Sequence, residues 1–239
     1  MQGPVRIGVL VGEKSENLQF IIDACRIRYI DGQVVFVGAL SPAVEGIKIA
    51  RINGISSFFV DGRQAITKAE SNKYSLPVFD LNKEVQHIVA NGPEEVGKIN
   101  DRVLVDSLLL AEIKKYDYDL LIMDSYTKLV SCFFIDAINV DNNGVHRLLS
   151  NHPSLLPAFK GLKAREQAFK SDVCVAGSSI IEVDYTMDSG RIIDQRAFYV
   201  ERPCTREYFF TMAEKNEKTL YVRALRKYIN DNYKKLRRV

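Results

Sequence analysis

The chain has 239 residues, of which 46% are hydrophobic and 26% charged, and its formal net charge is +3. This composition predicts a large globular domain with its own core, and it excludes a disordered tail, a collagen-like repeat and a small disulfide scaffold. No apolar run approaches the ~20 residues of a membrane span, and the apolar stretch at 7–11 is too short for a signal-peptide core. We therefore expect a cytoplasmic protein without membrane contact.

The cysteines and the basic C-terminus are two candidate features. The cysteines are Cys25, Cys132, Cys174 and Cys204. They form no CxxC pair and no histidine lies at ligand spacing, so we expect reduced, mostly buried thiols and no metal. Residues 223–239 carry seven Arg or Lys and one Asp. Apolar residues spaced by three and four predict an amphipathic helix at about 220–237 that packs on the core, with weak evidence for nucleic-acid binding.

The first sixty residues alternate between strand and helix patterns. Short apolar, β-branched runs predict strands, and apolar residues that recur every three or four positions predict helices. In chain order these are a strand at Val5–Val11, a helix at Leu18–Arg28, a strand at Gln33–Leu40, a helix at Ala43–Asn53 and a strand at Ile55–Val60. The alternation is typical of a parallel sheet covered by helices on both faces.

The alternation stops over 61–101, which we predict to be a mobile insertion. Further along, the patterns predict a helix at about 102–116, a strand at Leu120–Met123, a helix near 129–138, a strand ending at Leu149, antiparallel strands at Ser178–Val183 and Ile192–Val200, and a helix from about 205. Together they predict a single α/β domain over 1–239. Its sheet is open, twisted and mostly parallel, with helices on both faces and antiparallel C-terminal strands.

Ligands of an open parallel sheet bind beyond the carboxyl ends of its strands. The loops that qualify are 12–17, 124–128 and 150–161. The first runs into a helix, whose free backbone N–H groups can hold an anion, with Ser15 and Asn17 as further donors. The alternative, that Ser15 is a plain N-cap, has equal weight because Glu13 and Glu16 would repel a phosphate.

Two titratable residues are candidates for proton transfer. His152 follows a buried strand in a loop held by two prolines, which suits a general acid or base, although a structural histidine is the alternative. Asp188 lies in a tight loop after a strand, where a turn-capping role is the simplest interpretation. If Asp188 faces His152, the pair can hold an imidazolium or move a proton.

The segment RLLSNHPSLLPAFKG at 147–161 closely resembles the signature of phosphoribosylglycinamide formyltransferases. The likeness continues at 7–25, 164–169 and 177–195, and it omits only 61–101, a short stretch near 139–145 and the tail. The resemblance implies a Rossmann-like formyltransferase fold without a metal. It also implies transfer of a formyl group from 10-formyltetrahydrofolate, as co-substrate, to the amine of phosphoribosylglycinamide, a step of purine biosynthesis and one-carbon metabolism.

The resemblance also implies roles for individual residues. The catalytic positions are His152, Asp188 and Ser150. The substrate-binding positions are Gly12, Lys14, Ser15, Glu16, Asn17, Ser107, Arg147 and Glu217. The folate-binding positions are Thr127, Lys128, Leu129, Val130, Leu148, Val183 and Asp184.

Four positions depart from the family pattern. Ser150 stands where the family has an asparagine, Ile181 where a second histidine is common, and Ser107 where an arginine contacts the phosphate. Asp124-Ser125 replaces a turn of small residues. The retained His152 and Asp188 favour an active enzyme. The alternatives are a degenerate member that binds a phosphoribosyl or folate ligand or a protein partner without turnover, and a related formyltransferase or formyl hydrolase. Association into a homodimer is left open.

Overall fold

The structure is a computed structural model that describes residues 3–15, 17–70, 76–91, 98–139 and 144–237. Its strands are β1 (Val5–Val11), β2 (Gly32–Ala39), β3 (Ser56–Phe59), β4 (Leu120–Asp124), β5 (Leu148–His152), β6 (Val175–Glu182) and β7 (Ile192–Tyr199). Its helices are α1 (Leu18–Arg26), α2 (Glu45–Ile52), α3 (Gly62–Glu70), α4 (Leu81–Asn91), α5 (Ile99–Ile113), α6 (Cys132–Asn139), α7 (Ala164–Lys170) and α8 (Arg206–Leu236).

The strands of the described chain form one sheet in the order β3-β2-β1-β4-β5-β6-β7. The pairs from β3 to β5 are parallel, and β6 and β7 are antiparallel to their neighbours. The chain leaves β1 towards β2 on one side and returns to β4 on the other. This change of direction opens a crevice at the carboxyl ends of β1 and β4, where open α/β sheets bind ligands.

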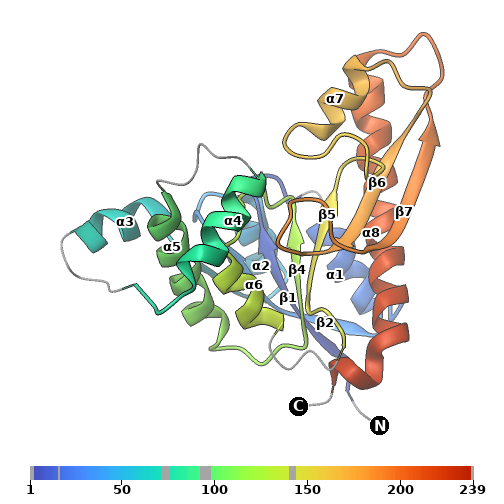
Figure 1. Cartoon of the computed structure of the whole chain (residues 1–239). Helices are drawn as coiled ribbons and strands as arrows, with labels where there is room; N and C mark the ends of the chain where they lie inside the picture. Colours follow the sequence, from blue (N-terminus) through green and yellow to red (C-terminus); the bar gives the residue numbers. More distant parts are fainter. Residues whose placement is uncertain (1–2, 16, 71–75, 92–97, 140–143, 238–239) are drawn as a thin grey trace.

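Helices cover both faces of the sheet (Figure 1). On one face, α1, α2 and α8 bury residues such as Leu18, Ile47 and Leu225 against β1, β2 and β4. On the other face, α5 and α6 bury Leu109 and Phe134 against the same strands. Because both faces are covered, the central strands are apolar almost throughout, as their sequence suggests.

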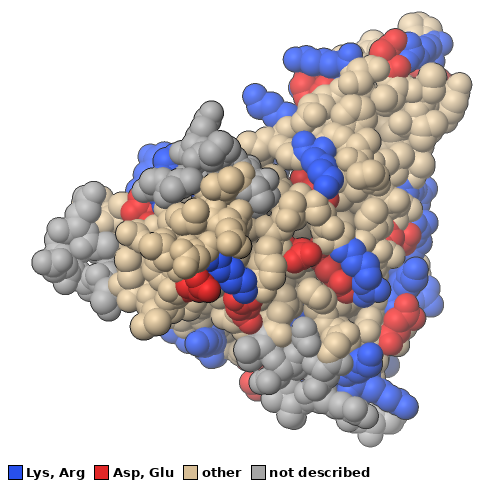
Figure 2. All heavy atoms as spheres, in the orientation of Figure 1, with Lys and Arg blue, Asp and Glu red and all other residues tan. Residues whose placement is uncertain are grey.

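The C-terminal helix is a single 31-residue helix, α8. Its buried side chains include Leu220, Tyr221, Leu225 and Ile229, which confirms that it packs on the core. On the face drawn in Figure 2, basic and acidic residues are interspersed, including along the edge where α8 lies. Among the described residues, no helix is long and apolar enough to cross a membrane.

The predicted fold class is confirmed, and three details differ. The strand expected to end at Leu149 continues to His152, because Ser150 to His152 pair with β6. The described part of 61–101 contains α3 and α4, although its mobility stays a prediction. The cysteines are not mostly buried, since only Cys132 is fully buried and Cys174 is exposed.

Candidate active site

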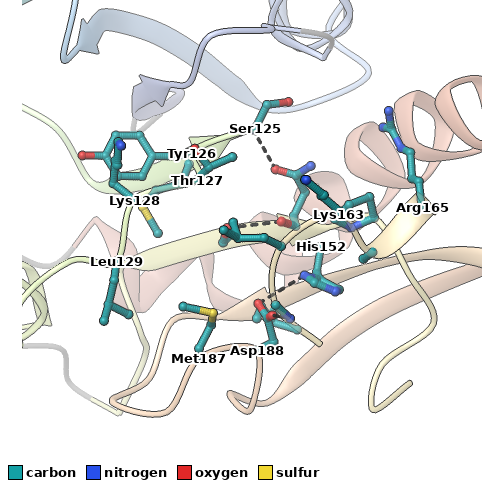
Figure 3. A pocket seen from close by; sticks show the side chains of 18 of the residues that line it. Ser125, Tyr126, Thr127, Lys128, Leu129, His152, Lys163, Arg165, Met187 and Asp188 are labelled. Carbon is teal, nitrogen blue, oxygen red and sulfur yellow. Dashed lines mark hydrogen bonds and ion pairs between the residues drawn. The ribbon is translucent and has the colours of Figure 1, made fainter. Parts of the chain in front are cut away.

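A cavity of about 710 Å³ opens at the carboxyl ends of β4 and β5. Its walls come from the loop after β4, from β5, from the loops that precede α7 and follow β6, and from α8 (Figure 3). This is the crevice that the sheet topology predicts. Its volume suits a ligand of several rings.

His152 and Asp188 meet inside this cavity. His152 ends β5, and its Nδ1 lies 3.2 Å from Oδ1 of Asp188, with both side chains largely buried. The other ring nitrogen, Nε2, lies 2.9 Å from the Phe159 carbonyl oxygen. A carboxylate and a carbonyl only accept hydrogen bonds, so the doubly protonated imidazolium is the form that satisfies both contacts.

Asp188 is held in the ionised form. Burial raises the pKa of Asp188, but the hydrogen bond and charge of His152, together with the Gly161 amide, outweigh burial and leave the pKa below its ordinary value. The Gly161 N–H donates to Oδ2 of Asp188 at 2.7 Å. Asp188 itself has φ 54°, a left-handed conformation that aspartate adopts more readily than most residues.

Serine hydroxyl groups hold the segment after His152 through hydrogen bonds to backbone groups. The Ser154 hydroxyl donates to the Ala158 carbonyl at 2.6 Å, and the Ser179 hydroxyl of β6 donates to the Ser154 carbonyl at 2.7 Å. Ser179 also accepts from the Leu156 amide at 3.0 Å. Serine at these positions therefore shapes the loop that follows the histidine.

Ser150 and Asn151 have different surroundings. Ser150 lines the cavity, and its hydroxyl donates to the carbonyl oxygen of Asn151 at 3.3 Å. The Asn151 amide is fixed at both ends, because Nδ2 donates to Glu217 at 2.7 Å and Oδ1 accepts from the Ser125 amide at 3.0 Å. Asn151 therefore does not take over the role of an asparagine at position 150.

Glu217 of α8 is the centre of a buried polar network. Its carboxylate accepts from Asn17 Nδ2 at 3.1 Å, from Asn151 Nδ2 at 2.7 Å and from Arg165 Nη2 at 2.9 Å. Glu217 is 1% exposed, and this set of donors compensates the cost of burying its charge. The network joins α8 to the loop before α1, to β5 and to α7.

The opposite half of the cavity is more apolar. Leu129, Val130, Ile135 and Val183 line it, together with Met187. This surface lies between the loop after β4 and the loop after β6. Such a wall suits a flat aromatic ring system with polar edges, and a pterin is a ring system of this kind.

Helix α4 connects the two loops of this apolar half. His87 Nε2 lies 2.9 Å from the Val130 carbonyl oxygen, and Nδ1 contacts the Tyr185 carbonyl oxygen. Lys83 donates to Asp136 at 2.6 Å and to the Tyr185 hydroxyl at 3.0 Å. His87, which sequence analysis did not assign to any site, is therefore buried in the cavity wall.

The structure brings most of the predicted site residues to the cavity. Those that line it are His152, Asp188, Ser150, Lys14, Glu217, Thr127, Lys128, Leu129, Val130, Val183 and Asp184. Those that do not are Gly12, Ser15, Asn17, Ser107, Arg147 and Leu148. Glu16 lies outside the described residues.

The predicted residues outside the cavity have partners of their own. Ser107 donates its hydroxyl to the Leu104 carbonyl within α5 at 2.7 Å, and the Arg147 amide donates to Asn139 at 2.8 Å. Leu148 belongs to the core beneath α6. Ser15 is not the N-cap of α1, which begins at Leu18 and has Asn17 at its N-cap position. Among the described residues, no cluster of side chains suited to a metal ion occurs.

Comparison with known proteins places this geometry in a family. The profile of the formyl transferase family matches residues 5–225. The chain therefore belongs to the formyl transferase family. The family's fold and the cavity at the carboxyl ends of β4 and β5 agree with this membership.

Individual relatives are similar at modest identity. The trifunctional purine biosynthetic protein adenosine-3 of Homo sapiens is 27% identical over 197 residues, which is 82% of this chain and 16% of that protein. Phosphoribosylglycinamide formyltransferase of Bacillus subtilis (strain 168) is 27% identical over 132 residues, covering 55% of this chain and 65% of the relative. The match thus spans less than two thirds of each relative's length.

A solved structure extends the comparison to the fold. Glycinamide ribonucleotide transformylase 1 from Symbiobacterium toebii superposes with a TM-score of 0.73 at 30% identity, covering 94% of this chain and 88% of that one. The match includes the mostly parallel sheet and its antiparallel C-terminal strands. The chain therefore shares the architecture of this transformylase.

Proposed function

We propose that this chain transfers a formyl group from 10-formyltetrahydrofolate to the amine of phosphoribosylglycinamide in the cytosol, as a step of purine biosynthesis. The observation that carries the proposal is the His152–Asp188 pair, with 3.2 Å between Nδ1 and Oδ1, inside a cavity that has one polar and one apolar half. The names of the Bacillus and Symbiobacterium relatives support the same acceptor.

The reaction needs a donor at a developing oxyanion. The acceptor amine attacks the formyl carbon, a C–N bond forms, and the carbonyl electron pair moves onto oxygen. Collapse of this tetrahedral species breaks the bond to N10 of the folate, while a proton moves from the amine to N10. Preorganised donors at the oxyanion are the largest single contribution to many reactions of this type.

His152 and Asp188 fit these requirements. An imidazolium at His152 donates to the oxyanion, and the ionised Asp188 keeps the ring oriented and compensates its charge. In this structure Nε2 bonds to the Phe159 carbonyl, so binding of the formyl oxygen requires exchange of that contact. Ser150, at the cavity wall, supplies a second and shorter donor.

A formyl-transfer assay with His152→Ala tests the proposal. We expect kcat to fall by roughly a hundredfold or more, because general acid catalysis typically contributes at least that factor. His146→Ala is the matched control, since His146 does not line the cavity, and it should retain activity. Equal rates for the wild type and His152→Ala would reject the mechanism. Folate binding by the wild type without turnover would instead identify a degenerate member.

A further inference from the structure

The N-terminus of α1 is already occupied by an anion from the chain itself. Asp124, the last residue of β4, is fully buried, and its Oδ2 accepts from the Asn17 amide at 3.2 Å and from the Leu18 amide at 3.1 Å. Its Oδ1 accepts from the Asn17 side-chain amide at 2.7 Å. These are the groups that would otherwise bind a phosphate at a helix N-terminus.

Two other residues of this loop, Gly12 and Ser15, also do not line the cavity. Ser15 is 4% exposed and packs against Gly46, where an added Cβ would lie 2.5 Å from its hydroxyl oxygen. Gly12 packs so closely on the next loop that an added Cβ would lie 1.8 Å from the Ser125 carbonyl oxygen. Of the described residues in this loop, Glu13 and Lys14 line the cavity.

A phosphate cannot join Asp124 at this position without a large electrostatic cost. Asn17 donates its amide to Glu217 as well as to Asp124, so two buried carboxylates already lie on either side of one side chain. A phosphate would add about two further negative charges at the same donors, and buried like charges repel strongly.

Cationic side chains elsewhere in the cavity offer a different binding site for a phosphate. Arg165 pairs with Glu217 at 2.9 Å, and Lys170 and Arg206 pair with Glu166 at 3.7 and 2.8 Å. Lys14, Lys128 and Lys163 also line the cavity, and none of them forms an ion pair with a described acidic residue. Lys128 belongs to the loop after β4, in the apolar half, so Lys14 and Lys163 are the candidates for an anion in the polar half. In Figure 3, the Lys163 side chain lies beside His152, on the side towards Ser125.

We propose that Asp124 is a built-in substitute for a substrate phosphate at α1, and that Lys14 and Lys163 bind the phosphate of the acceptor instead. This inference rests on the proposed function for the identity of the acceptor. Asp124 is thereby a specificity-determining residue, because it sets which wall of the cavity receives the anion. The acceptor's reactive amine is then presented to His152 from the α7 side of the cavity.

Ribose 5-phosphate is the probe, because its binding can be measured without folate and without turnover. We expect calorimetry to detect binding by the wild type, and Lys14→Met and Lys163→Met each to raise Kd by about tenfold, as expected for loss of one charged contact. In amide NMR spectra of the wild type, the Asn17 and Leu18 resonances should not shift on titration.

Asp124→Ser tests the other half of the proposal. This variant vacates the N-terminus of α1, so the Asn17 and Leu18 amides should shift on titration, and binding should depend less on Lys163. Asp117→Asn is the control, because it removes an exposed carboxylate far from the cavity and should behave as the wild type. If Asp124→Ser does not fold, the wild-type spectra and the lysine variants still decide.

Two outcomes would overturn the inference. One is absence of ribose 5-phosphate binding by the wild type. The other is a shift of the wild-type Asn17 and Leu18 amides with Kd unchanged in both lysine variants. Failure of the formyl-transfer assay alone would reject the proposed function and leave these binding results standing.

Discussion

At the scale of single residues, the two hydrogen bonds of His152 explain why the proposed catalytic pair needs a carboxylate. Nδ1 and Nε2 both face acceptors, so a positive charge on the ring is compensated only while Asp188 is ionised. Burial raises the pKa of Asp188, but the hydrogen bond to His152 outweighs it, and the lowered pKa favours the ionised carboxylate. The proposed role of Asp188 is therefore to compensate the charge of His152 and to orient its ring.

Asp188→Asn should lower kcat by roughly a hundredfold, because the amide cannot compensate the imidazolium charge. The change in the KM of either substrate should be small. Steady-state kinetics at pH 7.5 measures both, with Asp172→Asn, an exposed carboxylate paired with Arg202, as the control. A variant with wild-type kcat would show that His152 works without its carboxylate.

Ser150→Asn should raise kcat. Asparagine carries its donor farther from the backbone than serine does, and one oxyanion donor can contribute a hundredfold or more to the rate. Position 150 lines the cavity two residues before His152, so an amide there can reach the same reacting centre. Steady-state kinetics of Ser150→Asn beside Ser150→Ala checks this. An unchanged or lower kcat in Ser150→Asn would mean that the serine is not a shortened donor.

At the scale of elements, local sequence patterns predicted most of the strands and helices but few of the long-range contacts between them. The bounds of β1 coincide with the run predicted at Val5–Val11, because a buried parallel strand is apolar almost throughout, with Arg6 near its start as the exception. Helix α4 was missed because its apolar side chains, such as Val85 and Ile88, pack on Ile99 and Val103, and only the folded chain brings these together. The contact between Asp124 and Asn17 spans 107 residues, beyond any local signal.

Helix α4 should hold in place the two loops of the apolar half of the cavity, which is the proposed folate-binding half. His87 contacts carbonyl oxygens of both loops that line this half. Without these contacts we expect the two loops to move apart, so that folate binding must bring them together again. His87→Ala should therefore raise the KM for 10-formyltetrahydrofolate by about tenfold, as expected for about 1.4 kcal/mol of lost contact, and leave kcat nearly unchanged.

The matched control for His87→Ala is Gln86→Ala, because Gln86 is the exposed neighbour of His87 on the same helix. Direct folate binding by calorimetry should show the same loss as KM. A His87→Ala variant whose kcat falls while KM stays constant would place His87 in the chemical step instead.

At the scale of the whole molecule, one buried carboxylate connects the two ends of the described chain. Asp119 accepts from the Arg6 amide at 2.8 Å and from the Arg6 guanidinium at 2.8 Å, and Arg237 donates to it at 2.9 Å. Arg6 lies in β1 and Arg237 follows α8. The Tyr233 hydroxyl also donates to the Gly3 carbonyl at 2.6 Å, so these ends lie side by side.

Asp119→Asn should lower the free energy of unfolding at pH 7 by about 3–5 kcal/mol, because it removes the charged partner of two arginines from a buried site. Asp117→Asn is the control, since Asp117 contacts the same Arg6 but is 93% exposed, and its loss should cost at most about 1 kcal/mol. Urea unfolding of both variants measures the difference.

The same prediction has a pH dependence. Burial raises the pKa of Asp119, but the hydrogen bonds from Arg6 and Arg237 outweigh it and leave the pKa below its ordinary value. A lowered folded-state pKa means that the carboxylate stabilises the protein above the ordinary carboxyl pKa, and that this stability is lost as the pH falls through the folded-state value. The difference between the wild type and Asp119→Asn should therefore be full at pH 7 and shrink in strong acid. A constant difference would mean that packing, and not charge, joins the two ends of the chain.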